Sequence, residues 1–356
     1  MAVVFFVIIA FIGSYLFVTF LENIFKSKST EISPFSFNTI KKRDLSFDNE
    51  AIAWCANLLS IDKNTLEKIL YDDVCLLYKK FRIKKRKGGY RGIAWPQNTL
   101  MSIQKTIYSR ILLQVNIHPA ATGFRKGMSI VNNVKLHLGK EDIIKTDIVN
   151  FFGSIQQERV TKAFENIGYP SKISTVLAEL CCLYGRLPQG APTSPALSNI
   201  ISYEMDKKLT FLSHKYRLAY TRYADDLTFS GTGVNPELIL PEIKKAVNEE
   251  CFILKGKKTR YISKNRRKII TGISISSGDK LTIPKAKKRE IRKNVYFILT
   301  KGLAEHQRFI NSTDPVYLKR LICYLSFWKM VEPGNKYVTD SIIALKELST
   351  HNVRSQ

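Results

Sequence analysis

The chain has 356 residues, of which 45% are hydrophobic and 24% are charged. This composition excludes a disordered protein, because there are enough apolar side chains to fill one large core or two or three smaller ones. The 56 Lys and Arg residues exceed the 30 Asp and Glu residues, for a formal net charge of +26. We therefore expect a polyanionic partner, nucleic acid being favoured over membrane phospholipid. The cysteine spacing excludes a zinc site.

The first segment, residues 1–21, contains no charged side chain. At about 1.5 Å per residue, a helix of this length crosses a hydrocarbon core of about 30 Å, so the segment predicts a transmembrane anchor. Lys26, Lys28 and the "KKR" of residues 41–43 follow it. The positive-inside rule then predicts a single-pass membrane protein whose larger part is cytoplasmic, with residues 22–44 as a linker. A buried N-terminal helix is the alternative.

Residues 45–116 predict helices around one hairpin. Between residues 45 and 77, apolar residues recur at helical spacing on both sides of "SIDKNT", which favours two helices. Residues 81–96, "FRIKKRKGGYRGIAWP", predict a β-hairpin with five basic side chains near its tip. Phosphate contact is favoured over a solvated turn. Residues 96–116 predict an amphipathic helix.

Two further segments carry carboxylates. "DIIKTDIVNFFGSI", residues 142–155, begins as a strand and carries Asp147, while "LAYTRYADDLTFSG", residues 218–231, predicts a hairpin with Asp225 and Asp226 at or near its turn. Adjacent aspartates alone are more typical of a surface turn. If Asp147 lies beside that turn, however, two divalent cations, expected to be Mg²⁺, can cancel the repulsion and the desolvation cost. Such a metal pair can activate a 3′-hydroxyl and stabilise leaving pyrophosphate.

These blocks together resemble the palm of a reverse transcriptase: the Asp147 block, "LPQGAPTSPALSN" at residues 187–199, and "YADD" at residues 223–226. "KGGYRGIAWP", "HPAATGFRKGMSIVNNVKLH" (118–137) and "ITGISIS" (270–276) are similar to blocks of the bacterial retron reverse transcriptases. Two positions depart from that pattern, namely Val134 in place of Ala and "ITG" in place of "VTG". The resemblance covers about residues 45–300.

The resemblance implies an α+β, right-hand polymerase fold that follows the N-terminal transmembrane helix. Its parts are the fingers and a palm of antiparallel sheet and helices over residues 45–270, and a helical thumb with a C-terminal RNA-binding region over residues 271–356.

The resemblance also implies roles for individual residues. Two Mg²⁺ ions are bound by Asp147, Asp225 and Asp226, with help from the backbone of Ile148. The implied dNTP-binding residues are Arg91, Lys85, Phe152, Gln189 and Lys258, with Lys257 a rival for the last. Phe152 would exclude a 2′-hydroxyl. Asn133 and His137 fall in a block that the family uses for RNA recognition. The amphipathic pattern of residues 283–303 resembles a thumb helix, whose implied RNA-binding cations are Lys287, Lys288, Arg292 and Lys293.

The function implied is RNA-directed DNA polymerisation. The enzyme would copy part of a cognate structured non-coding RNA into a branched RNA–DNA product (msDNA), primed from a 2′-hydroxyl, in an antiphage defence system with a separate effector protein. It would be tethered to the inner face of a bacterial membrane. The alternatives are a group II intron-like or diversity-generating reverse transcriptase, an RNA-dependent RNA polymerase, and a non-catalytic RNA-binding scaffold at the membrane.

Overall fold

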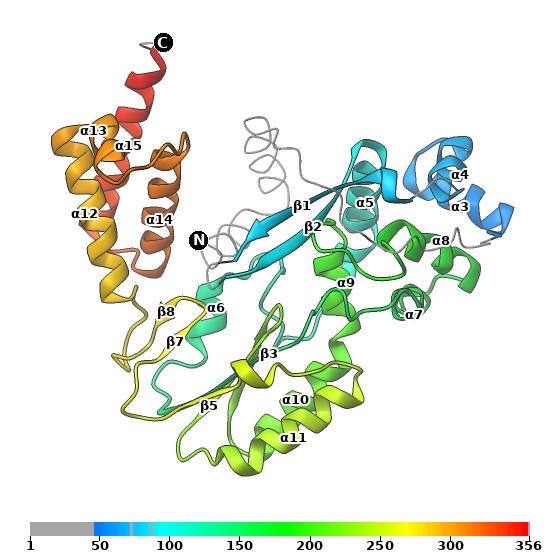
Figure 1. Cartoon of the computed structure of the whole chain (residues 1–356). Coiled ribbons are helices and arrows are strands. Elements are labelled where there is room, and N and C mark those ends of the chain that lie inside the picture. The colour runs from blue at the N-terminus through cyan, green and yellow to red at the C-terminus, as the bar shows by residue number, and fades with distance from the viewer. Residues whose placement is uncertain (1–45, 72–73, 86–87, 355–356) are drawn as a thin grey trace.

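The computed structural model describes residues 46–71, 74–85 and 88–354, which form a mixed α+β fold (Figure 1). Helices lie at both ends of the described chain, and an antiparallel sheet lies between them. The α+β class predicted from the sequence is confirmed.

Two helices open the described chain, as predicted. The Asp48 carboxylate accepts hydrogen bonds from the backbone amides of Glu50 and Ala51, each at 3.0 Å. It thereby satisfies amides that have no partner within the first helix. The helices of this part are α3 (Asn49–Leu59), α4 (Lys63–Tyr71), the 3-10 helix η1 (Val74–Leu77), α5 (Asn98–Arg110) and the 3-10 helix η2 (Leu112–Gln114).

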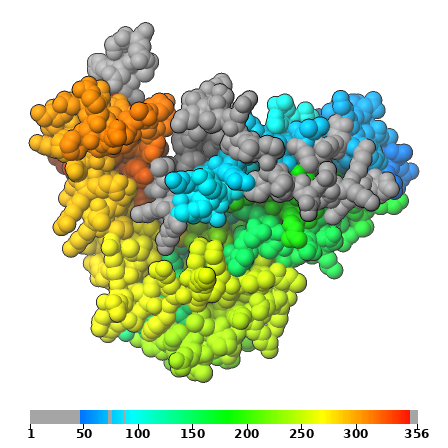
Figure 2. Space-filling model, in the orientation of Figure 1, coloured from blue at the N-terminus to red at the C-terminus, as the bar shows by residue number. Residues whose placement is uncertain are grey.

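The predicted basic hairpin is present. Strands β1 (Tyr78–Lys84) and β2 (Tyr90–Pro96) pair antiparallel, with Lys84 opposite Tyr90. The tip cations at residues 86 and 87 lie outside the described residues. Figure 2 shows the hairpin in cyan between the N-terminal helices in blue and the C-terminal helices in orange.

The sheet that carries the predicted carboxylates has four antiparallel strands in the order β4-β5-β3-β6. On one of its faces, Ile144, Tyr220 and Phe229 enter the larger of two hydrophobic cores, and the Tyr220 and Phe229 rings stack at 4.6 Å. On β5, Phe229 alternates with the polar residues Thr228 and Ser230, whereas on β3 the neighbour of Ile144 is Ile143, which enters the second core. The two faces of the sheet therefore meet different surroundings. The strands are β3 (Asp142–Asp147), β4 (Ala219–Tyr223), β5 (Asp226–Gly231) and β6 (Arg260–Ile262).

Helices surround this sheet, and in Figure 1 α10 and α11 lie below it. Leu209 of α10 and Ile243 and Val247 of α11 are fully buried in the larger core. The helices here are α6 (Ile130–Lys135), α7 (Gln157–Ile167), α8 (Ser171–Cys181), α9 (Ser194–Ile201), α10 (Tyr203–Lys215), α11 (Pro236–Glu249) and the 3-10 helix η3 (Gly256–Lys258).

The C-terminal helices gather around the second core, to one side of the sheet (Figure 1). The amphipathic helix predicted over residues 283–303 is α12, whose Ile291, Val295 and Ile298 are buried, although Leu299 of the predicted stripe is exposed. The elements are β7 (Ile269–Ile270), β8 (Ile273–Ser274), α12 (Lys285–Lys301), α13 (Leu303–Phe309), α14 (Tyr317–Val331) and α15 (Lys336–Arg354).

Glu332, at the end of α14, ties this bundle to the segment that leads into α12. Its carboxylate accepts hydrogen bonds from Thr282 Oγ1 at 2.6 Å and from Trp328 Nε1 at 2.9 Å, and it pairs with Lys288 Nζ at 2.6 Å. Burial pushes the Glu332 pKa upward, but these partners outweigh it and hold the pKa at about 2. The carboxylate is therefore ionised at neutral pH.

The predicted location at the inner membrane is corrected. Among the helices of residues 46–71, 74–85 and 88–354, none is both long and apolar enough to cross a bilayer. The anchor itself was predicted at residues 1–21 and the linker at residues 22–44, which lie outside the described residues.

Candidate active site

The structure brings the three predicted aspartates together at one end of the sheet. Asp147 is the last residue of β3 and the register partner of Asp226, the first residue of β5. Partners across an antiparallel pair have Cα atoms about 4.5 to 5.5 Å apart and side chains on the same face. Asp225 lies in the turn between β4 and β5, and its carbonyl accepts a hydrogen bond from the Ile148 amide at 2.9 Å. We call residues 223–226 the aspartate turn.

Positive charges act on both carboxylates of this turn. Burial raises the pKa of Asp225 to about 6, Asp226 adds to the rise, and the positive charges of Arg91 and Lys255 oppose it. Burial also raises the pKa of Asp226, and there Lys145 opposes the rise. Arg91 and Lys255 are therefore electrostatic neighbours of Asp225, and Lys145 is the neighbour of Asp226.

The segment at residues 255–258 closes one side of the site. The Lys255 amide donates a hydrogen bond to the Asp147 carbonyl at 2.7 Å, and Lys258 Nζ forms an ion pair with the Asp147 carboxylate. Lys258, chosen from the sequence, thus lies at the aspartates, whereas no contact places its rival Lys257 there. The sequence analysis missed Lys255, because the lysines of the "KGKK" run cannot be distinguished until the fold shows which of them lies beside the aspartates.

The donor chemistry fits a hard divalent cation, because carboxylate oxygens are the ligands that Mg²⁺ prefers. The rise in the pKa of Asp225 is a second sign of fit, since a bound cation would relieve the cost of charging a buried carboxyl beside another. Within the described residues, however, no group of three or more His, Cys, Asp or Glu side chains is already arranged as a metal site. A cation at Asp147 would also have to displace Lys258.

The Gln189 loop and the hairpin form a second wall. The Ala94 amide of β2 donates a hydrogen bond to the Gln189 carbonyl at 2.9 Å. Gly190 has φ +126°, and a Cβ there would stand 2.6 Å from the Ala94 carbonyl oxygen, so only glycine fits. The charge of Arg91, on the same strand, reaches Asp225. Lys85 is exposed at the far end of β1, and no contact brings it to the aspartates.

Phe152 is half-buried and Phe151 belongs to the larger core. The Phe152 ring lies 5.6 Å from the Phe151 ring and 6.0 Å from the Phe124 ring. Phe124 was missed by the sequence reasoning, and its φ of +60° is unusual for an aromatic residue.

The prediction that Asn133 and His137 contact RNA is corrected. Asn133 is 1% and His137 0% exposed, so neither side chain is presented to a macromolecule. Asn133 Oδ1 accepts a hydrogen bond from Thr122 Oγ1 at 2.9 Å, and both His137 ring nitrogens hydrogen bond, to Ser230 Oγ and Thr221 Oγ1, at 2.7 Å each. Burial, with a smaller contribution from nearby lysines, lowers the pKa of His137 to about 3. The imidazole is neutral and joins β4 to β5.

Two of the four predicted α12 cations face the neighbouring helix. Lys288 pairs with Glu332, and Lys287 Nζ lies 3.9 Å from the Tyr324 ring centroid. Arg292 and Lys293 are exposed, although the Arg292 guanidinium also lies 5.5 Å from the Trp328 ring. Lys287 Nζ also pairs with Glu290 Oε1 at 2.8 Å. Of the four, and within the described residues, Arg292 and Lys293 are therefore the two that could meet a phosphate backbone without first leaving an ion pair.

The chain is similar in sequence to known reverse transcriptases. Residues 83–292 match the family described as "Reverse transcriptase (RNA-dependent DNA polymerase)". The chain is 32% identical over 275 residues to the Retron Ec86 reverse transcriptase of Escherichia coli, covering 75% of this chain and 85% of that protein. It is 31% identical to the Retron Ec83 reverse transcriptase of E. coli, covering 74% and 94%. It is 29% identical to the Retron Mx162 reverse transcriptase of Myxococcus xanthus, covering 71% and 61%. A solved structure of apo telomerase from Candida tropicalis aligns with 78% of this chain and 57% of its own, at 13% identity and a TM-score of 0.45.

The chain is of the class of enzymes that synthesise nucleic acid, because the family match includes β2, the Gln189 loop and all three aspartates. The chain belongs to the reverse transcriptase family, and it is an RNA-directed DNA polymerase of retron type.

Proposed function

We propose that this enzyme reverse-transcribes part of a cognate structured non-coding RNA, primes from a 2′-hydroxyl of that RNA, and leaves a branched msDNA. The observation that carries the proposal is the meeting of Asp147, Asp225 and Asp226 at one end of the sheet. The retron relatives support the choice of substrate.

The fold is interpreted as a right hand. The fingers and palm would comprise residues 45–270, and the thumb and RNA-binding region residues 271–356. Within the described residues, one hydrophobic core lies among the sheet and most of the helices that precede α12, and a second lies mainly among α12–α15, which supports this division. The second core also takes in Ile130 and Val134 of α6 and Ile143 of β3, so the two parts pack against each other. The hydrogen bond between β2 and the Gln189 loop would join fingers to palm beside the nascent base pair.

Two Mg²⁺ ions held by Asp147, Asp225 and Asp226, with the Ile148 backbone, would supply activation of the 3′-hydroxyl and charge stabilisation of the transferring phosphoryl group. The protein's part is to hold Asp147 and Asp226 as register partners on the paired strands β3 and β5, with Asp225 in the turn beside them. Pre-organised groups of this kind lower the barrier because they cost no reorganisation at the moment of reaction.

The surrounding side chains would bind the nucleotide. The positive charges of Arg91 and Lys255 oppose the rise that burial causes in the pKa of Asp225, and both side chains would orient the triphosphate. Lys258, adjacent to Asp147, would face the pyrophosphate once a metal takes its place. Phe152 would pack beneath the sugar and exclude a ribose 2′-hydroxyl, and Gln189 would contact the nascent pair. Lys85, at the hairpin end, would add a more distant phosphate contact.

RNA and the DNA product would lie along the exposed cations of α12, Arg292 and Lys293, through contacts with the phosphate backbone. The wider setting, an antiphage defence system with a separate effector protein, follows from the retron assignment.

The test is recovery of the product. The protein is purified from its native host, and the nucleic acid bound to it is extracted and treated with RNase. A short DNA linked to an RNase-sensitive stem is expected from the wild type and not from an Asp225→Asn variant. Recovery of bulk RNA alone from the wild type would contradict the retron assignment while leaving polymerase chemistry open.

A further inference from the structure

A fully buried ion pair lies directly behind the aspartate turn. Arg222 of β4 and Asp206 of α10 both have side chains that are 0% exposed. Arg222 Nε donates to Asp206 Oδ1 at 2.8 Å and Nη2 to Oδ2 at 2.6 Å, which makes the pair bidentate. The Tyr220 hydroxyl donates to Asp206 Oδ1 at 2.8 Å. The carboxylate is thus fully engaged, and the guanidinium is held in one orientation.

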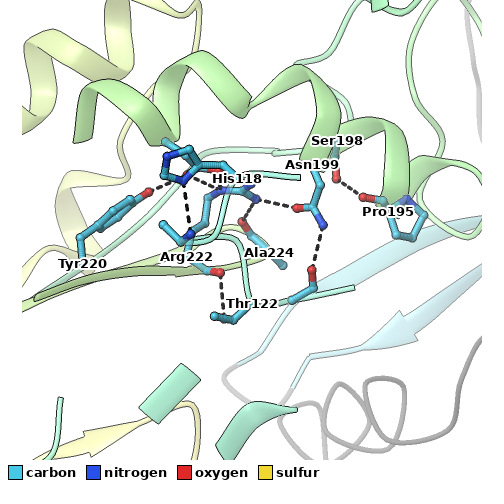
Figure 3. A network of polar contacts seen from close by, with 11 residues as sticks. His118, Thr122, Pro195, Ser198, Asn199, Tyr220, Arg222 and Ala224 are labelled. Carbon is cyan, nitrogen blue, oxygen red and sulfur yellow. Dashed lines mark hydrogen bonds and ion pairs between the residues drawn. The ribbon is translucent and has the colours of Figure 1, made fainter. Parts of the chain in front are cut away.

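The remaining arm of the guanidinium reaches the turn itself. Arg222 Nη1 donates to the Ala224 carbonyl at 3.2 Å and to Asn199 Oδ1 at 3.0 Å (Figure 3). Ala224 has φ +59°, a left-handed conformation that is strained for a residue with a Cβ. The captured carbonyl belongs to the peptide that links Ala224 to Asp225. Its orientation therefore fixes the direction in which Asp225 leaves the turn.

The preceding peptide of the turn, which links Tyr223 to Ala224, packs against Gly123. A Cβ at Gly123 would stand 2.8 Å from the Ala224 amide nitrogen, so the two backbones are in close contact. Asn199 Nδ2 donates to the Gly123 carbonyl at 2.8 Å, and the Thr122 amide donates to the Arg222 carbonyl at 2.9 Å. The turn is thus clamped between Arg222 and the 122–123 segment, and Asn199 joins the two sides (Figure 3).

Stability alone does not account for this arrangement. Taking two charges out of water is costly, and a well-packed hydrophobic pair in the same place is often as stable or more so. What a hydrophobic pair cannot supply is a donor for the Ala224 carbonyl. The geometry thus separates two roles, since the Asp206 contacts hold the guanidinium and Nη1 holds the turn.

We infer that Arg222 is a positioning residue of the polymerase reaction: held by Asp206 and Asn199, it fixes the Ala224 peptide and so aims the aspartates of the turn at the metal ions. The inference rests on the proposed role of Asp225 and Asp226, and it deepens that role by naming what holds them. Arg222 itself touches neither metal nor nucleotide.

The decisive variant is the double substitution Arg222→Met with Asp206→Leu, which removes both charges and leaves neither buried alone. We expect it to fold, and kcat for addition of one dNTP to fall about 100-fold, because displacement of reacting groups by about 1 Å costs that much. The KM for dNTP should change little. Two readouts do not involve catalysis: amide hydrogen exchange across residues 223–227 should speed up, and Mn²⁺ binding to the nucleic-acid-free protein should weaken.

Leu209→Ala is the matched control. Leu209 lies on α10, one turn beyond Asp206, and is 0% exposed, so its truncation destabilises the same helix without removing a donor to the turn. Well below its melting temperature, this variant should keep wild-type kcat and Mn²⁺ affinity. If the double variant did not fold, Arg222→Lys would take its place, because it keeps the charge opposite Asp206 but lacks the fork that also serves the turn.

The possible results distinguish a failure of the positioning role of Arg222 from a failure of the proposed function. Wild-type kcat, exchange and Mn²⁺ binding in the folded double variant, or in Arg222→Lys, would overturn the positioning role and leave the enzyme intact. If the wild type did not polymerise DNA but the double variant showed the expected changes in hydrogen exchange and Mn²⁺ binding, the proposed function would be overturned. The positioning role would then still stand.

Discussion

His137 makes the stability of the protein depend on pH in a way that can be worked out from its surroundings. Its side chain has no exposed surface and hydrogen bonds to Ser230 and Thr221, and burial lowers its pKa to about 3. In the unfolded chain a histidine has a pKa of about 6.5. Between these values the unfolded state binds a proton that the folded state does not, so stability falls as the pH falls.

The size of this effect follows from the two pKa values. At about 1.36 kcal/mol per pH unit below pH 6.5, lowering the pH from 7 to 5 should remove about 2 kcal/mol of unfolding free energy through His137 alone. Above about pH 6.5 the contribution is fully present, and it is lost progressively as the pH falls toward 3.

Urea unfolding at pH 7 and pH 5 measures this, with wild type compared with His137→Gln. The variant should lose about 2 kcal/mol less than wild type over this interval, whatever its stability at pH 7. His214→Gln is the control, because His214 is exposed and its removal should leave the pH dependence as it was. An equal pH dependence in wild type and His137→Gln would refute the reasoning and reopen a surface role for His137.

Three further substitutions test the walls of the site. Phe152→Ala should raise the ratio of ribonucleotide to deoxynucleotide incorporation about tenfold or more, measured with single nucleotides, and an unchanged ratio would remove this side chain from sugar selection. Lys258→Ala should lower kcat for nucleotide addition about 10- to 100-fold while Lys257→Ala leaves it near wild type, and equal effects would contradict the assignment. Gly190→Ala should lower the unfolding free energy by about 1 to 3 kcal/mol, because Gly190 has a positive φ and lies against β2. The loss should exceed that of Gly233→Ala, since Gly233 also has a positive φ but faces open space; equal losses would mean that the close contact does not matter.

Much of the fold could be predicted because local patterns determine it. The hairpin at residues 81–96, the turn at Asp225 and Asp226, and the amphipathic helix at residues 283–303 are each specified by periodicity and turn chemistry within a short stretch. The meeting of Asp147 with the turn needed the order of the family's blocks, because no local pattern shows which strands pair.

What could not be predicted depends on burial and on contacts between distant segments. His137 was assigned to RNA because a histidine in a known block looks functional, and only the fold shows that it is enclosed by β4 and β5. The role inferred for Arg222 had one signal in the sequence, a charged residue inside a strand-like run. Its partner Asp206 lies on a preceding helix, and spacing alone does not connect the two.

The central claim is that Asp147 and the two aspartates of the turn act together in nucleotide addition. Its most direct measurement is the rate at which Asp147→Asn and Asp225→Asn proteins add a single dNTP to a primer annealed to an RNA template, with folding verified by thermal unfolding. We predict a loss of at least about 1,000-fold for each, equivalent to about 4 kcal/mol of barrier, with the fold intact. A folded variant of either kind that polymerises at the wild-type rate would contradict the account.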